Sequence, residues 1–279
     1  MAGFPRTVVD GVSLPRLICG SNWMLGYSHI TNAKDHLIQD LFDTPTKVAN
    51  VVEIFARAGC NAFMSVANEF VAEALQEVQQ RTGVEMLWIA TPSYAEKGNP
   101  DTWRQSVDRA KALGARLCFP HQSVVDPLLD VRHKRFHPLL TEHLRYVREA
   151  GMIPGLSSHT PEAILCADES NADVATYIQP YNLDGFLCQV EPDWLQRTFR
   201  RASKPVMTIK PLAAGRLHPL AGLNFVWSTI RECDMVTIGT MSPYEAEEVI
   251  EISLACLERR DPNLDLSFSR SKQLLAEGG

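Results

Sequence analysis

The stretch from Pro205 to Val249 decides the fold, because it contains one structural unit twice: PVMTIKPLAAGRL (205–217) and DMVTIGTMSPYEAEEV (234–249). Each half opens with a short apolar run rich in β-branched residues, 207–209 and 235–238, which is typical of strands buried on both faces. Lys210 ends the first run, and the second run ends at Gly239 and Thr240. Ser242 followed by proline predicts a helix start, with serine as N-cap. Two successive strand–helix units predict parallel strands.

The same unit can be followed along the whole chain. The predicted strands are residues 17–21, 62–66, 86–91, 116–120, 153–157, 175–179, 207–209 and 235–238, and a helical pattern follows each of them. Eight such units predict an α/β fold, a (β/α)8 TIM barrel that forms a single domain over residues 1–279. The alternative is an open doubly wound sheet, but no glycine-rich dinucleotide motif follows the first strand.

The two ends of the chain carry additions to the barrel. RTVVDGVSLPRL (6–17) has two short runs on either side of Asp10-Gly11, a strong signal for a β-hairpin. We expect this N-terminal β-hairpin to plug one end of the barrel. The last predicted helix ends near Arg260, and residues 261–279 are expected to form a tail with one more helix.

Composition narrows the functional class. The formal net charge of −6 and the lack of a basic stripe argue against a nucleic-acid partner. No run of 18 apolar residues predicts a membrane span, and the start lacks a signal-peptide pattern. The seven scattered cysteines are expected to be reduced, buried thiols, so we predict a cytoplasmic protein. Its expected partner is a small-molecule substrate. The sequence leaves open whether the protein forms a homo-oligomer.

Polar residues cluster where the predicted strands end. Because catalytic residues of such barrels lie at the carboxyl ends of the strands, we expect catalysis by His121, Lys210, His159 and Glu69. Lys210 is a candidate for an acid–base group, for an oxyanion partner or for a Schiff-base amine. Glu69, His121 and His159 also form a candidate ligand set for a divalent metal. The structural alternatives are a helix-dipole role for Glu69, a helix-capping role for His159 and an ion-pair role for Lys210.

Further polar and aromatic residues near the strand ends are candidates for substrate binding. Their composition suits a sugar-like ligand, although it also suits many other ligands. The expected substrate-binding residues are Asn22, Trp23, His29, Asn68, Gln179, Tyr181 and Asn182.

Four segments of the second half resemble the aldo/keto reductase superfamily: REAGMIPGLSSHTPEAI (148–164), IQPYN (178–182), KPLAAGRL (210–217) and VTIGTMSPYEAEEV (236–249). The SSH and KPLAAGRL forms look closest to its branch of predicted oxidoreductases. The resemblance covers about residues 110–255 and implies the barrel fold. It also implies that an NAD(P) cofactor would place its phosphates on the turns after the last two strands. The implied cofactor-binding residues are Gly215, Arg216, Gly239, Thr240 and Ser242.

The catalytic residues of that superfamily are mostly replaced here. Its reductases use an Asp and a Tyr after the second strand, a Lys after the third and a His after the fourth. This chain has Met64 or Ser65 at the Asp position, Phe70 near the Tyr position and Pro92 at the Lys position; only His121 matches. Phenylalanine cannot protonate a carbonyl oxygen, so hydride transfer would lack its acid.

Three functions are consistent with these residues. The favoured one is a non-redox enzyme, a lyase, hydratase or isomerase, that acts on a small sugar- or polyol-derived carbonyl compound by His, Lys and Glu acid–base chemistry, with or without a metal. The second is an NAD(P)-dependent reductase with rearranged catalytic groups. The third is a catalytically inactive barrel that binds a ligand.

Overall fold

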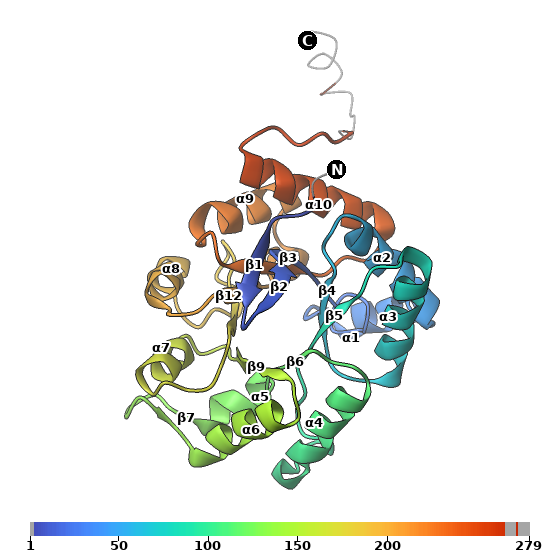
Figure 1. The fold of residues 1–279 in the computed structure, drawn as a ribbon. Coiled ribbons are helices and arrows are strands. Elements are labelled where there is room, and N and C mark those ends of the chain that lie inside the picture. The colour runs from blue at the N-terminus through green and yellow to red at the C-terminus, as the bar shows by residue number, and fades with distance from the viewer. Residues whose placement is uncertain (1–2, 266–271, 273–279) are drawn as a thin grey trace.

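A computed structural model of the chain describes residues 3–265 and residue 272. Its central sheet contains nine parallel strands that follow the chain order around a ring. They are β3 (Leu17–Gly20), β4 (Ala62–Ser65), β5 (Leu87–Ala90), β6 (Leu117–Cys118), β9 (Ile153–Pro154), β10 (Leu156–Ser157), β11 (Tyr177–Pro180), β12 (Val206–Ile209) and β13 (Met235–Ile238). The ring of strands lies at the centre of the molecule, with helices around it (Figure 1). The predicted TIM barrel is therefore confirmed.

The nine strands correspond to eight predicted ones, because β9 and β10 are two halves of one strand. β9 pairs with β6, and β10 pairs with β11, so the strand closes the ring across Gly155. Glycine is required there: an added Cβ would lie 2.4 Å from the ring of Phe119, a fully buried side chain. The interruption is thus a consequence of close packing inside the barrel.

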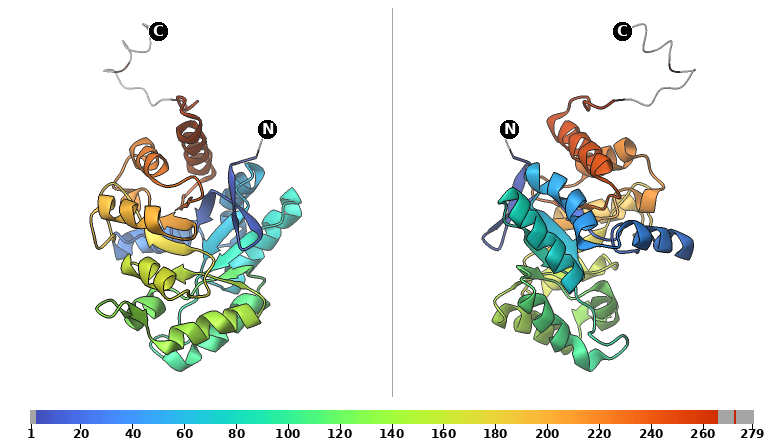
Figure 2. Two further views of the ribbon diagram at one scale, coloured as in Figure 1. Left: turned by 60° about the vertical axis from the view of Figure 1, so that its left-hand side comes forward. Right: turned by 90° about the vertical axis from the view of Figure 1, so that its right-hand side faces the viewer.

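The hairpin is formed by β1 (Arg6–Val9) and β2 (Val12–Pro15), which pair antiparallel around Asp10-Gly11. Val9 and Leu14 belong to the same buried cluster as Ile18, Ile89 and other residues that point into the barrel. The hairpin therefore seals the amino-terminal end with apolar side chains, as predicted. Figure 2 (right) shows it at one edge of the molecule, opposite α1 (Asn32–Leu41).

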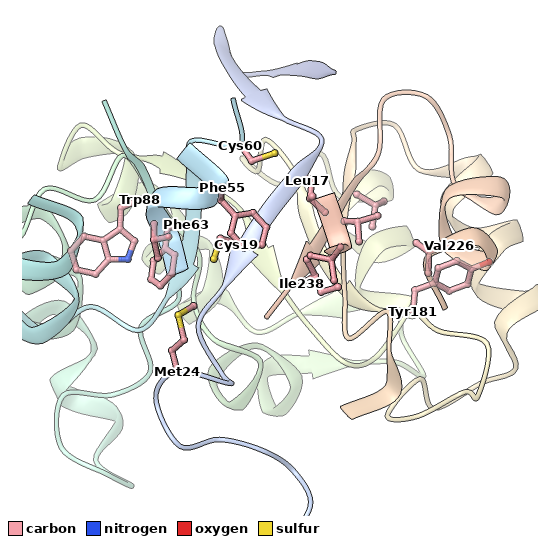
Figure 3. Packing of buried hydrophobic residues seen from close by; sticks show 14 of the residues in the cluster. Leu17, Cys19, Met24, Phe55, Cys60, Phe63, Trp88, Tyr181, Val226 and Ile238 are labelled. Carbon is pink, nitrogen blue, oxygen red and sulfur yellow. The ribbon is translucent and has the colours of Figure 1, made fainter. Parts of the chain in front are cut away.

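The outer layer consists of helices that pack on the outward faces of the strands. Besides α1 they are α2 (Pro45–Arg57), α3 (Glu69–Thr82), α4 (Trp103–Ala112), α6 (Pro138–Glu149), α7 (Glu162–Glu169), α8 (Pro192–Arg201), α9 (Pro219–Thr229) and α10 (Pro243–Glu258). Figure 3 shows the packing between the two layers, with Phe55 of α2 near Cys19 and Phe63 of the strands. Strand residues alternate between this layer and the barrel interior.

Two segments add elements to the predicted units. Residues 32–41 form α1, whose N-cap Thr31 accepts a hydrogen bond from the amide of Lys34. The long loop after β6 contains a short helix and a small antiparallel hairpin: α5 (Gln122–Val125), η2 (Asp126–Leu128), β7 (Leu129–Asp130) and β8 (Arg135–Phe136). Two further 3-10 turns are η1 (Pro100–Thr102) and η3 (Ala213–Gly215). Apart from residues 261–265, the expected tail lies almost wholly outside the described residues.

No helix among the described residues is long and apolar enough to cross a membrane.

A buried carboxylate fastens the strands near the amino-terminal end of the barrel. Asp234 is fully buried and accepts hydrogen bonds from the amide of Val206, at the start of β12, and from the amide and guanidinium of Arg231. Its backbone carbonyl accepts a further bond from Nε of Arg16. One side chain therefore connects the start of β12 to the turn before β13.

We expect Asp234→Ala to lower the free energy of unfolding by about 3–5 kcal/mol, because it leaves the Arg231 guanidinium without its buried partner. The matched control is Asp173→Ala, which removes an exposed carboxylate paired with Arg148 and should cost about 0–1 kcal/mol. Urea unfolding measures both changes. Similar losses in the two variants would contradict the structural role of Asp234.

Candidate active site

A cavity of about 780 Å³ opens at the carboxyl-terminal rim of the barrel. Every strand of the ring except β9 contributes to it directly or through the turn that follows. The contributing residues include Gly20, Met64, Thr91, His121, Ser157, Ile178, Ile209 and Thr237. The cavity lies at the end opposite the hairpin, because all strands of a parallel barrel point to one rim. Its size is within the usual range for small-molecule sites.

Lys210, directly after β12, lines this cavity. Its backbone has a φ of +63°, a left-handed conformation that is costly for a residue with a Cβ. Burial lowers the pKa of the Lys210 amine to about 8. No carboxylate forms an ion pair with Lys210 anywhere in residues 3–265, so its charge is uncompensated.

Three imidazoles line the same cavity: His29, His121 and His159. The pKa of His159 is lowered to about 4, first by burial and then by the neighbouring charge of Lys210. The pKa values of His121 and His29 are also lowered, first by desolvation and then by Lys210. All three rings are therefore neutral near pH 7.

The hydrogen bonds of two imidazoles fix their tautomers. Nδ1 of His121 accepts a hydrogen bond from the amide of Ser123 (3.3 Å), so the neutral ring carries its proton on Nε2. Nε2 of His29 lies 3.2 Å from Nδ2 of Asn22, an amide donor, so His29 carries its proton on Nδ1. His121 therefore presents an N–H donor from Nε2, whereas Nε2 of His29 is occupied as an acceptor.

Sequence reasoning missed the residue that positions His159. Asp126, at the start of η2, accepts hydrogen bonds from the Ser158 hydroxyl and from the amide of His159 (3.3 Å). The carbonyl of His159 accepts a bond from Nε2 of Gln179 (3.1 Å). The His159 backbone is thus held from both sides. The only sequence signal for Asp126 is Asp-Pro in a long loop, which also occurs in ordinary turns.

Most of the predicted rim residues do line one cavity. These are Asn22, Trp23, His29, His121, His159, Lys210, Gly215, Gly239 and Thr240. Thr237 also lines the cavity. The hydroxyls of Thr237 and Thr240 are buried and have no hydrogen-bond partner within the described residues.

The metal set does not form, because Glu69 lies elsewhere. Glu69 is the first residue of α3, where its exposed carboxylate pairs with Arg109. Asn68, predicted to bind substrate, is the N-cap of that helix and accepts a hydrogen bond from the amide of Val71 (2.9 Å). Within the described residues no group of three or more His, Cys, Asp or Glu side chains could hold a metal ion.

Three predicted substrate-binding residues do not line the cavity. Ile178 points into the cavity, and side chains along a strand alternate between its two faces. Gln179 and Tyr181 therefore both point outward, away from the cavity. The Tyr181 hydroxyl donates to Thr229 in the helix layer, where Figure 3 shows Tyr181 beside Val226. Asn182 instead folds the following turn by bonding both the amide and the carbonyl of Phe186.

Two of the predicted cofactor residues are also engaged elsewhere. The Arg216 guanidinium lies 4.1 Å from the ring centroid of Phe186 and donates to the carbonyl of Ala213. Ser242 is the N-cap of α10, and its hydroxyl accepts a hydrogen bond from the amide of Glu245 (3.1 Å).

The turn before α10 does not fit the phosphates of a nicotinamide dinucleotide. The carboxylate of Glu245 accepts a hydrogen bond from the amide of Met241 (2.7 Å), so an anion already occupies this donor. Glu248 adds a second carboxylate to the cavity wall. In the described part of the chain no arginine lines the cavity, so nothing there forms the bidentate phosphate contact that arginine provides.

No protein-family model and no curated protein sequence matches this chain. Solved structures do resemble it. The putative aldo-keto reductase of Pseudomonas aeruginosa has a TM-score of 0.61 at 17% identity, over 90% of this chain and 95% of that one. Aldose reductase of Giardia lamblia has a TM-score of 0.57 at 13% identity, over 91% and 89% of the two chains.

A ribulose-1,5-bisphosphate carboxylase/oxygenase of Pyrococcus horikoshii also resembles the chain, with a TM-score of 0.53 at 10% identity over 78% of this chain and 56% of the other. At such identities the likeness concerns the fold. The chain therefore has a barrel fold like that of the aldo-keto reductases, and its chemistry has to be argued from its own cavity.

Proposed function

We propose that this protein is a non-redox enzyme, of the lyase, hydratase or isomerase type, that acts on a small sugar- or polyol-derived carbonyl compound. The observation that carries the proposal is Lys210: a partly buried amine without a carboxylate partner, in a cavity that also holds three neutral imidazoles. Burying a cation without compensation costs free energy, so the chain keeps it against its own stability. Groups with strongly perturbed pKa values in a cleft are typical of catalytic sites.

The cavity supplies the groups that proton transfer next to a carbonyl requires. Lys210 engages the carbonyl group of the substrate, and Nε2–H of His121 donates to the oxygen as charge develops there. His159, held through its backbone, is a neutral base for the proton on the adjacent carbon. The polar and aromatic lining residues Asn22 and Trp23 suit a polyol-derived compound.

The second candidate, an NAD(P)-dependent reductase, is favoured by the likeness in fold to aldo-keto reductases. Two features of the cavity weigh against it. Of the two residues at the position of the missing Asp, Met64 is apolar, and the Ser65 hydroxyl already accepts a hydrogen bond from the indole N–H of Trp88. The carboxylates of Glu245 and Glu248 line the part of the cavity where a dinucleotide would place its phosphates.

We expect Lys210→Met to abolish turnover while the protein becomes more stable. Loss of the group at the carbonyl should lower kcat/KM by about 10²–10⁴-fold. Proton exchange into short polyhydroxy aldehydes and ketones in deuterium oxide, followed by proton NMR, gives a readout that needs no known product. The matched control is Lys204→Met, whose amine pairs with Asp168 away from the cavity.

The stability gain of Lys210→Met should depend on pH. The folded-state pKa is about 8 and the unfolded value is near 10.4, so the folded state resists protonation below pH 8. The variant should therefore gain on the order of 1–3 kcal/mol at pH 7, and the gain should shrink as the pH rises from 8 to 10. Exchange that survives in Lys210→Met within a few-fold would contradict the proposed site.

The reductase alternative can be tested separately. We expect no oxidation of NADPH by this protein with a panel of simple aldehydes, because other residues replace the Asp, Tyr and Lys of the reductases and because the phosphates would meet carboxylates. Absorbance of NADPH measures this, with an active aldo-keto reductase as the positive control. Saturable oxidation that disappears in His121→Ala would identify the protein as a reductase.

A further inference from the structure

We propose that Lys210 acts as a covalent catalyst, forming an imine with the carbonyl carbon of a short polyhydroxy aldehyde or ketone. This inference rests on the proposed function, and it specifies how Lys210 engages the carbonyl. It differs from a non-covalent role, in which a protonated Lys210 would only donate a hydrogen bond to the carbonyl oxygen.

The surroundings of Lys210 favour an amine that attacks over an ammonium that stays charged. The one acidic group near it is the thiol of Cys188, whose pKa burial raises to about 11, so this thiol is neutral at pH 7. The other titratable groups that face Lys210 are His29, His121 and His159, which are neutral as well. The carboxylates of Glu245 and Glu248 line the same cavity, but within the described residues none forms an ion pair with Lys210.

Other lysines of the chain show the contrast. Lys204 pairs with Asp168 at 3.8 Å, and Lys47 pairs with Asp43 at 2.9 Å. Neither amine lines the cavity. At pH 7 an amine with a pKa of about 8 is neutral for about one tenth of the time, whereas an ordinary lysine is neutral for less than about one part in 10³. The neutral form that can attack a carbonyl is thus about 10²-fold more populated at Lys210. An amine of lower pKa is intrinsically less nucleophilic, which offsets part of this advantage.

The imine step balances without an added reactant. Nζ of Lys210 adds to the carbonyl carbon, and the proton that the nitrogen loses moves to the former carbonyl oxygen. His121 or His159 can carry this proton, since a neutral imidazole can take it from nitrogen and return it to oxygen. A second proton, also from the original ammonium, allows the oxygen to leave as water. The net change converts one ammonium and one carbonyl into a protonated imine and one water.

The protonated imine suits the remaining groups in the cavity. Its positive charge draws electrons from the neighbouring C–H or C–C bond, so that a weak base such as neutral His159 suffices to take a proton from carbon. The left-handed backbone of Lys210 continues in Ala213 and Ala214, with φ values of +49° and +57°. The turn that carries the amine is therefore strained at three non-glycine residues, as is common where structure serves a site.

Reductive trapping tests the imine directly. The intact protein is incubated at pH 7 with dihydroxyacetone and sodium cyanoborohydride, which reduces a protonated imine to a stable secondary amine. Mass spectrometry of the whole protein counts the adducts, and peptide mapping locates them. We expect one rapid adduct at Lys210, formed about tenfold faster than adducts at other lysines.

Variants distinguish a failure of the imine proposal from a failure of the proposed function. The rapid adduct should disappear in Lys210→Met and in Lys210→Arg, which keeps the charge, and should remain in Lys204→Met. Adducts that spread over the surface lysines at similar rates in wild type and variants would overturn the imine. If Lys210→Met loses proton exchange although wild type is never labelled, the imine is wrong and the proposed function stands. If exchange survives that substitution, the proposed function itself fails.

Discussion

Closure of a parallel sheet into a ring is the constraint on which the site depends. Strands far apart in sequence, such as β6 and β12, end at the same rim because every strand of the ring runs parallel to its neighbours. The ring closes only where one strand crosses Gly155, whose missing side chain leaves room for the ring of Phe119. Packing inside the barrel and convergence of His121 and Lys210 at its mouth are thus parts of one geometry.

The two ends of the barrel treat charge in opposite ways. Near the hairpin, Asp234 is fully buried, but its carboxylate is compensated by Arg231 and by backbone donors. At the opposite rim, Lys210 is partly buried with no anion beside it. A buried charge with its partners supports the structure, whereas a buried charge without a partner lowers the stability of the fold. Such a destabilising group is typical of a reactive site. This asymmetry is the physical reason to place the chemistry at Lys210.

The sequence predicts the barrel well, because the fold follows from one strand–helix pattern that repeats along the chain. A run such as 235–238 followed by Ser242 and proline defines its strand and helix without any long-range information. The rim residues that end such strands, including Lys210 and His121, could be placed in the cavity for the same reason. Glu69 and Asn68 could not, since a helix start follows them at once and turns their side chains to capping and surface pairing. Asp126 reaches His159 only because a long loop folds back, which no local pattern records.

The central claim is that burial without a carboxylate partner lowers the pKa of the Lys210 amine. The most direct measurement is an NMR titration of the lysine side chains, labelled with ¹³C at Cε, with Lys210 assigned from its absence in Lys210→Met. We expect a Lys210 resonance that titrates near pH 8, below the reference value of about 10.4 for lysine. A Lys210 resonance that titrates together with the surface lysines would contradict it.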